Sequence, residues 1–167
     1  SGSSAPSPDG TGETIAPDRP LILSSDGIDG VMLGAKLEDL PQVWQDAVNY
    51  RIERTACPVG PILGFEVAMI MLLHEELTVA AISIGPKVGA RTSIGVNLGD
   101  HLEDVVGVFG DRLELFRLER SGRQAASAVV PNGDGRLVTW SFVLSEDGLV
   151  EQIEISLAGE PLVSWCA

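Results

Sequence analysis

One segment of this chain occurs twice, and that repetition constrains the fold more than any other feature. Residues 30–46 read GVMLGAKLEDLPQVWQD, and residues 95–111 read GVNLGDHLEDVVGVFGD. Such self-similarity is typical of a duplicated supersecondary unit. We therefore expect two tandem repeats, one over residues 21–86 and the other over residues 87–167. The identical pairs are Gly30/Gly95, Val31/Val96, Leu33/Leu98, Gly34/Gly99, Leu37/Leu102, Glu38/Glu103, Asp39/Asp104, Val43/Val108 and Asp46/Asp111.

Each repeat is expected to open with a short extended piece and a helix. In G-V-x-L-G the final glycine permits a turn, and the apolar residues that follow predict one face of a short helix. In the second repeat Asp100 and Glu103 have the spacing of a capping box, with Asp100 as the N-cap. In the first repeat Pro41 must lie in the first helical turn or kink the helix, so the helix is expected to start near Asp39 or Leu40. The expected buried residues are Leu37, Leu40, Val43 and Trp44 in one helix and Leu102, Val105, Val108 and Phe109 in the other.

Antiparallel strands are expected after each helix, because β-branched and aromatic residues alternate with polar ones between turn signals. The turns include Asn132-Gly133-Asp134-Gly135 and Glu146-Asp147-Gly148. The prediction is an α+β fold in which two helices cover one sheet and leave its other face exposed. The expected strands are residues 50–56, 64–73 and 77–84 in the first repeat, 113–119, 137–144 and 149–157 in the second, and 21–23 as a leading strand; residues 85–92 form the linker.

This combination of G-x-x-L-G, a short helix containing L-E-D, and antiparallel strands in tandem resembles the β-lactamase-inhibitory-protein fold. It is also similar to the small lipoproteins of the outer-membrane β-barrel assembly machinery, which carry one such unit. The resemblance covers residues 30–157 and implies an exported, non-enzymatic module that presents a curved sheet to a partner protein. Inhibitory members use many exposed aromatic residues, whereas only 5% of this chain is aromatic, so the resemblance does not extend to β-lactamase inhibition.

The net charge of the chain limits the classes of partner that it is expected to bind. The chain has 167 residues and a formal net charge of −13, which argues against nucleic acid and anionic membrane surfaces, since both need clustered Lys and Arg. Residues 1–20 are rich in Ser, Gly, Pro and Thr and are expected to be a flexible tether. This tether resembles the segment that follows the lipidated cysteine of exported bacterial lipoproteins, especially actinobacterial ones. It implies an extracytoplasmic protein of the cell envelope that reaches the membrane only through a lipid anchor outside this chain; a remnant of an expression tag is the alternative.

The two cysteines, Cys57 and Cys166, allow one disulfide in an exported chain. Their spacing fits neither a zinc site nor a redox pair. The alternative is that both are small buried apolar residues. We expect the disulfide.

No cofactor, metal site or catalytic centre is predicted. His74-Glu75-Glu76 falls in an expected hairpin turn without the helical H-E-x-x-H spacing, and His101 is expected to face solvent. There is no G-x-S-x-G motif, and residues 85–92 lack the G-K-[ST] ending of a phosphate loop. The paired acids of L-E-D are explained by the positive end of a helix dipole.

One set of residues is a candidate binding site. In Y-R-I-E-R and F-R-L-E-R the apolar residues are expected to face the helices, which directs Arg51, Glu53, Arg117 and Glu119 to the open sheet face. These residues either solvate that face or dock a partner protein, where arginine binds carboxylates and stacks on aromatic rings. The predicted function is a protein-interaction module for an envelope or extracellular protein. A carrier or sensor of a small apolar ligand, held between helices and sheet, is the alternative; an enzyme of unknown type is the third.

Overall fold

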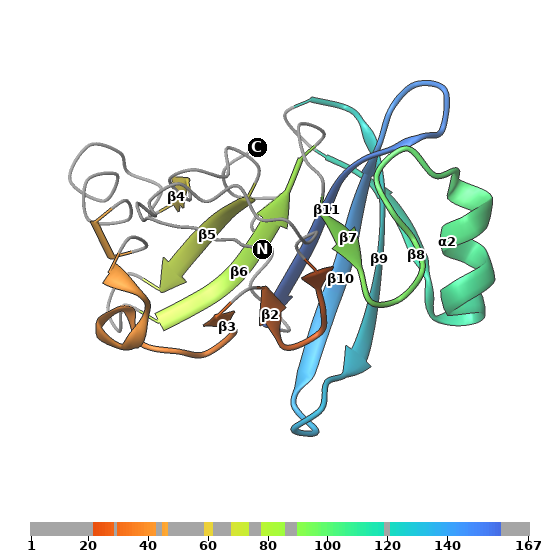
Figure 1. Ribbon diagram of the computed structural model, residues 1–167. Helices are drawn as coiled ribbons and strands as arrows, with labels where there is room; N and C mark the ends of the chain where they lie inside the picture. The colour runs from red at the N-terminus through yellow and green to blue at the C-terminus, as the bar shows by residue number, and fades with distance from the viewer. Residues whose placement is uncertain are drawn as a thin grey trace, which may run out of the picture.

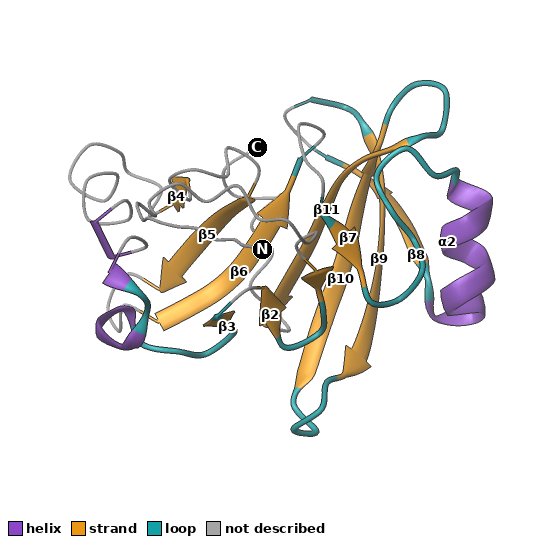
Figure 2. Ribbon diagram, viewed as in Figure 1, coloured by secondary structure: helices purple, strands orange, loops and turns teal. Residues whose placement is uncertain are grey.

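The computed structural model describes residues 22–28, 30–42, 45–46, 59–61, 68–73, 78–85, 90–118 and 121–157. Within these ranges the chain is α+β, as predicted, with one short α-helix; its strands form two sheets rather than the single sheet that was expected (Figures 1 and 2). No helix among the described residues is long and apolar enough to cross a membrane.

The larger sheet has seven strands, and every neighbouring pair in it is antiparallel. The strand predicted over 137–144 is confirmed with the same bounds, and the last strand starts one residue later than predicted. The strand predicted over 50–56 lies outside the described residues. In spatial order the strands are β4 (Val59–Pro61), β5 (Ala68–Leu73), β6 (Thr78–Ile84), β11 (Val150–Leu157), β10 (Leu137–Leu144), β9 (Gln124–Pro131) and β8 (Glu114–Arg117).

Strand β9 was not predicted from the sequence. Its residues read QAASAVVP and include three alanines. Alanine and serine have little strand preference of their own, so the segment lacks the alternation of large apolar side chains that marks β10. The long pairing with β10, from Pro131–Leu137 to Ala125–Val143, makes it a strand.

The smaller sheet contains β1 (Ile22–Leu23), β2 (Gly27–Ile28), β3 (Val31–Met32) and β7 (Arg91–Thr92), in the order β3-β2-β1-β7. The strands β1 and β7 pair in parallel, whereas the other pairs are antiparallel. Strand β7 therefore places Arg91 and Thr92, which were expected in a linker, within a sheet. In the second G-V-x-L-G segment, residues 95–99, no strand corresponds to β3, and a turn is formed at residues 98–99.

The helix α2 (Leu102–Phe109) confirms the second predicted helix and corrects its start. Its N-cap is His101, whose N–H donates to the Asp104 carboxylate at 2.9 Å. The carboxylate of Asp100 instead accepts the N–H of Asn97 at 2.8 Å, inside the preceding turn. The expectation that Val108 is buried is wrong, because its side chain is 41% exposed.

The corresponding part of the first predicted repeat does not begin with an α-helix. A short 3-10 helix, η2 (Leu37–Asp39), precedes Pro41. The N–H of Gln45 then donates to the carbonyl of Pro41 at 3.2 Å, which is the i to i−4 bond of a helical turn starting at the proline, consistent with the prediction. In the second repeat a 3-10 helix, η3 (Gly110–Arg112), follows α2.

The main core lies on the face of the large sheet that we call the inner face. Trp140 and Phe142 stack with ring centroids 6.3 Å apart, and the Phe109 ring of α2 lies 5.8 Å from Phe142. These rings and the isoleucines of β6 and β11 form one cluster with the small sheet. Burying side chains of this size stabilises the fold by about 1.5–3 kcal/mol each. The cluster includes Leu23, Ile28, Val31, Leu37, Ile82, Ile84, Val105, Phe109, Trp140, Phe142, Ile153 and Ile155.

The opposite face, here called the outer face, is not open over the central strands, which corrects the expectation from sequence. Ser83, Glu154 and Ser141 are direct cross-strand partners and therefore share this face. Ser83 and Ser141 are 2% exposed, and Glu154 is fully buried. The side-chain amide of Gln152 donates to Ser83 Oγ at 2.7 Å on the same face. The prediction missed this burial because serine and glutamate alternating with isoleucine are typical of a solvated face.

The two G-V-x-L-G segments make corresponding backbone contacts. Gly34 N–H donates to Val79 O at 2.8 Å, and Val79 N–H donates to Ala35 O at 2.8 Å. In the second repeat Gly99 N–H donates to Val150 O at 2.8 Å, and Val150 N–H donates to the Asp100 carbonyl at 2.7 Å. Isolated bridges follow at the same step, Lys36 with Thr78 and His101 with Leu149. Each G-V-x-L-G segment is therefore attached to the start of a long strand in the same way.

Matching irregularities interrupt the two strand pairs that follow. Between β5 and β6 the register shifts after Met71–Ala81, so that Leu72 pairs with Val79 and Ala80 is the extra residue. Between β10 and β11 it shifts after Val143–Gln152, so that Leu144 pairs with Val150 and Glu151 is extra. Each pair thus contains one β-bulge at the corresponding step.

Candidate partner-binding site

Of the residues predicted from sequence to bind a partner, the structure describes only Arg117. Its guanidinium is exposed and donates from Nη1 to the carbonyl of Gly122 at 2.8 Å. Arg51, Glu53 and Glu119 lie outside the described residues, as do Cys57 and Cys166. The single surface proposed for the four charged residues therefore stays a prediction.

The orientation predicted for strand β8 is wrong. Phe116 pairs with Ala125, and Leu118 and Val143 join them in a small apolar cluster on the outer face. Side chains alternate along a strand, so Arg117 points to the inner-face side of the sheet, where the helix lies. The pattern F-R-L-E-R shows that apolar and charged residues alternate, but it does not show which face of the sheet the apolar residues occupy. They occupy the outer face because β8 packs in a small apolar cluster that is separate from the main core.

A projecting hairpin is the most distinctive surface element of the described chain. The pairing of β8 with β9 ends at Glu114–Ser127, and the pairing of β10 with β11 ends at Val138–Leu157. Residues 128–139 therefore continue beyond β8 and almost entirely beyond β11, and Figure 1 shows the β9–β10 hairpin extending past its neighbours. We call residues 128–139 the arm.

The tip of the arm is held by a dense set of short-range hydrogen bonds. Asn132 N–H donates to Arg136 O at 2.8 Å, and Gly135 N–H donates to Asn132 O at 3.0 Å. The side-chain oxygen of Asn132 accepts the N–H groups of Asp134 and Arg136, both at 2.9 Å. Gly135 has a φ of +82°, the conformation that such a three-residue turn requires of its last residue. The turn predicted from N-G-D-G is confirmed, and it presents Asp134 and Arg136 on a defined backbone.

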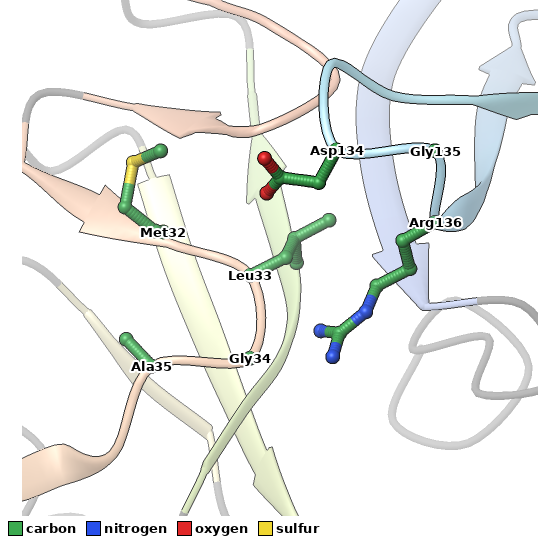
Figure 3. Close-up of a pocket in the computed structure, with 7 residues that line it drawn as sticks. All are labelled: Met32, Leu33, Gly34, Ala35, Asp134, Gly135 and Arg136. Carbon is green, nitrogen blue, oxygen red and sulfur yellow. The ribbon is translucent and has the colours of Figure 1, made fainter.

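A hollow of about 670 Å³ separates the tip of the arm from the loop after β3 (Figure 3). The guanidinium of Arg136 reaches across it toward Gly34, and the carboxylate of Asp134 points toward it from the other end (Figure 3). Gly34 has a φ of +88°, and a Cβ there would collide with the Arg136 guanidinium. The hollow therefore has apolar residues of the β3 loop on one side and one charge of each sign on the other. Its lining residues are Met32, Leu33, Gly34, Ala35, Asp134, Gly135 and Arg136.

The tip of the arm and Trp140, the residue that follows the arm, both lie against the turn between β1 and β2. The indole N–H of Trp140 donates to Ser25 Oγ at 3.1 Å, across 115 residues of sequence. The carboxylate of Asp26 lies so close to Gly133 that a Cβ at that glycine would be 3.3 Å from it. Residues 25 and 26, far away in the sequence, therefore lie close to the base and the tip of the arm.

Exposed apolar side chains lie on the arm away from the hollow. Leu137 is 54% exposed and Val129 is 47% exposed. Leu137 pairs with Pro131, and Val129 pairs with Thr139, so all four share the outer face. Sequence reasoning missed this surface, although the uncharged run QAASAVVP before an N-G-D-G turn was a visible signal.

The described residues offer little for metal or acid–base chemistry. They contain no group of three or more His, Cys, Asp or Glu side chains that could hold a metal ion. The hollow is lined by one acid and one base without a nucleophile beside them, which suits recognition by charge and shape.

Comparison with known proteins adds no relative. No family model matches the chain, and neither curated proteins nor solved structures give a match.

Proposed function

We propose that this chain is a non-enzymatic binding module, built from two copies of one α+β unit, that contacts a partner protein through the arm. The observation that carries the proposal is the arm itself. It is an element that one copy has and the other lacks, and it presents exposed apolar side chains.

The duplication is supported by the sheet registers. Aligning the matching bulges places Ala68, Met69, Ile70 and Met71 of β5 on Trp140, Ser141, Phe142 and Val143 of β10. The same alignment places β6 on β11 and β4 on β9. The sheet order β4-β5-β6-β11-β10-β9 then reads as one unit followed by its mirror order, with β6 beside β11 at the junction. Two copies of a sheet joined edge to edge in antiparallel fashion produce this order.

The same alignment identifies the arm as an addition. In the first repeat Pro61 pairs with Met69, and seven residues lie between them. In the second repeat the corresponding pair is Ser127 and Ser141, and thirteen residues lie between them. The hairpin of the second repeat is six residues longer, which adds three residues to each strand. Those residues include Val129, Pro131 and Leu137.

Exposed apolar side chains on a projecting element favour binding. Single exposed apolar residues are common on protein surfaces, but here three apolar residues lie together on the outer face of the arm. Burying such side chains against a partner is the main favourable term in protein association, and few residues supply most of it. The rim charges of the hollow would then contribute to specificity.

The experiment shortens the arm to the length of the first repeat. Deleting residues 129–131 and 137–139 keeps the Asn132–Arg136 turn and removes the three added pairs. Envelope proteins recovered by the tagged full chain are compared with those recovered by the shortened chain. We expect at least one protein that the full chain recovers to be lost.

Two further variants control for damage to the fold. Combined Val129→Thr and Leu137→Ser substitutions keep the length of the arm and should change the free energy of unfolding by less than about 0.5 kcal/mol, since both residues are exposed. They should weaken partner binding tenfold or more, about 1.4 kcal/mol. The matched control is Asp147→Asn at the β10–β11 turn, which should bind as the wild type. Recovery that is unchanged in both arm variants would refute the proposal.

The alternative function is a carrier or sensor of a small ligand, and the hollow is the observation in its favour. The hollow differs from the site expected for that function, because it lies between a loop and a hairpin rather than between helices and sheet, and its rim is charged. A ligand that binds wild type and not Arg136→Ala, with the partner bound equally by both, would favour this alternative.

The location that we propose is the cell envelope. It rests on the composition of residues 1–20 and on the even cysteine count. Fractionation of cells that express the full precursor provides the test, and recovery of the protein in the cytosolic fraction would contradict it.

A further inference from the structure

We infer that the arm binds its partner by strand addition: an extended, uncharged segment of the partner pairs with the free edge of β9 at Val129. This inference rests on the proposed function and specifies how the arm would make its contact.

The edge is free because β8 stops short. The register of β8 with β9 runs from Arg117–Gln124 to Glu114–Ser127 and ends there. The rest of β9, residues 128–131, still pairs with β10 on its other side. Among the described residues no strand pairs with this half of the β9 edge, and the Val129 side chain beside it is 47% exposed.

Two hydrogen bonds fix which backbone groups point outward. Asn132 N–H points toward β10, since it donates to Arg136 O, and Arg123 O points toward β8, since it accepts from Leu118 N–H. In an antiparallel ladder residues alternate between the two neighbours. Counting from either end, Val129 directs both its N–H and its C=O to the free edge, while the groups of Val130 face β10. Pro131 adds a carbonyl at that edge and has no N–H to offer.

The composition of the edge points to the chemistry of the occupant. The chain has 35 charged residues, yet Gln124–Pro131 contains none. Natural edge strands are usually protected from pairing by charged side chains, bulges or proline. Only Pro131, at the end of β9, has that effect here. An added strand would place its residue opposite Val129 on the outer face, beside the exposed Val129 side chain, so that residue should be apolar and uncharged.

The length of the free edge does not allow a second copy of this chain to pair symmetrically about Val129. Antiparallel pairing of two β9 strands about Val129 would set the second copy's Pro131 opposite Ser127, a position that Glu114 already occupies. The apolar strip is also only three residues long, far from the roughly 800 Å² per partner that a stable interface between folded surfaces needs. A short extended segment fits this edge, and main-chain hydrogen bonds supply much of the affinity in that binding mode.

The test selects ligands and then removes single backbone donors. A phage-displayed library of random nine-residue peptides is selected on the immobilised full chain, and binding of the enriched peptides is measured by fluorescence polarisation. We expect peptides with apolar β-branched or aromatic residues at alternate positions. They should bind Val129→Pro at least tenfold more weakly than wild type, because the proline removes the outward N–H.

Val129→Pro should fold, because the Val129 N–H makes no bond to β10 and edge strands accept proline at such positions. Its melting curve checks this. Val129→Thr keeps the backbone donor and should retain most of the affinity. If Val129→Pro does not fold, N-methylation of each peptide residue in turn provides the test on the wild-type protein, and one or two methyl groups should abolish binding.

The outcomes separate the two proposals. Equal binding of the peptides to wild type and to folded Val129→Pro, affinity that no single N-methyl group changes, or a library that yields no peptide dependent on the arm would each overturn strand addition. Partner recovery that depends on the arm but survives Val129→Pro would also overturn strand addition while leaving the proposed function intact. Recovery that is independent of the arm would overturn both.

Discussion

The two segments that the sequence predicts to be repeats share several backbone contacts and differ in the length of one hairpin. Both attach a G-V-x-L-G segment to the start of a long strand by the same two hydrogen bonds, and both interrupt the next strand pair with a bulge at the same step. The hairpin between β9 and β10 is six residues longer than the one between β4 and β5, and Arg136 at its tip lies against Gly34. Features common to both repeats are therefore explained by folding, and the feature present once is the better candidate for function.

The largest effect is expected from the covalent link that the sequence predicts between the repeats. Cys57 falls in the first repeat and Cys166 in the second, so a disulfide would close a loop of over a hundred residues. Removing it by Cys166→Ser should lower the free energy of unfolding by about 4–5 kcal/mol in the chain-entropy model. Titration of the unreduced, denatured exported protein should find no free thiol. Two reactive thiols per chain would contradict the disulfide and weaken the case for export.

Phe109→Ala and Trp44→Ala test whether the two corresponding helices contribute equally to the free energy of unfolding. Phe109 is buried and contacts the Phe142 ring, so truncation should leave a cavity and cost about 3–5 kcal/mol in denaturant unfolding. The sequence places Trp44 at the corresponding position of the first repeat, and Trp44→Ala should cost a similar amount. A cost below about 1 kcal/mol for Trp44→Ala would show that the two helices are not equivalent.

The smallest expected effects come from substitutions at the two corresponding glycines. Gly34 and Gly99 correspond and have φ values of +88° and +92°. Alanine at either position should cost about 1–2 kcal/mol, because L-residues disfavour positive φ. A Cβ at Gly99 meets no atom within 4 Å, whereas one at Gly34 displaces the Arg136 guanidinium. Gly34→Ala should therefore weaken partner binding as well, and Gly99→Ala should not.

The control for this comparison is the Arg136→Ala background. If the guanidinium is what the new methyl group displaces, Gly34→Ala should have no further effect on binding once Arg136 is removed. Equal losses of binding for Gly34→Ala and Gly99→Ala would show that the effect comes from the backbone rather than from the hollow.

The sequence predicted the second repeat well because its signals are local. Trp140 and Phe142 alternate with polar residues between two turn motifs, and the bounds of β10 follow directly. The helix start was missed by one residue because Asp100 and Asp104 are both suitable capping acids, and the bond from Asn97 to Asp100 decides between them. Strand β9 was missed because its small residues become a strand only through the neighbours that they pair with.

The candidate site could not be predicted because it is made by contacts between distant residues. Nothing near Gly34 in the sequence indicates that Arg136 lies over it, and nothing near Ser25 indicates that Trp140 bonds to it. The charged residues chosen instead were visible as a repeated pattern. Their side of the sheet depended on a small apolar cluster around Val143 that the alternation alone does not contain.

The two bulges set the phase of the side-chain pattern in the long strands. In β6 the core residues Ile82 and Ile84 have even numbers, but Val79, also in the core, has an odd one. In β11 the core residues Ile153 and Ile155 have odd numbers, whereas Val150 has an even one. One extra residue, Ala80 or Glu151, shifts the alternation by one step so that both ends of the strand face inward. Deleting that residue would remove the shift in alternation, so that the valine at the start of the strand would face away from the core. Alignments of related chains should therefore be anchored on the bulge, and a gap placed beside it would misassign every side chain up to the next turn.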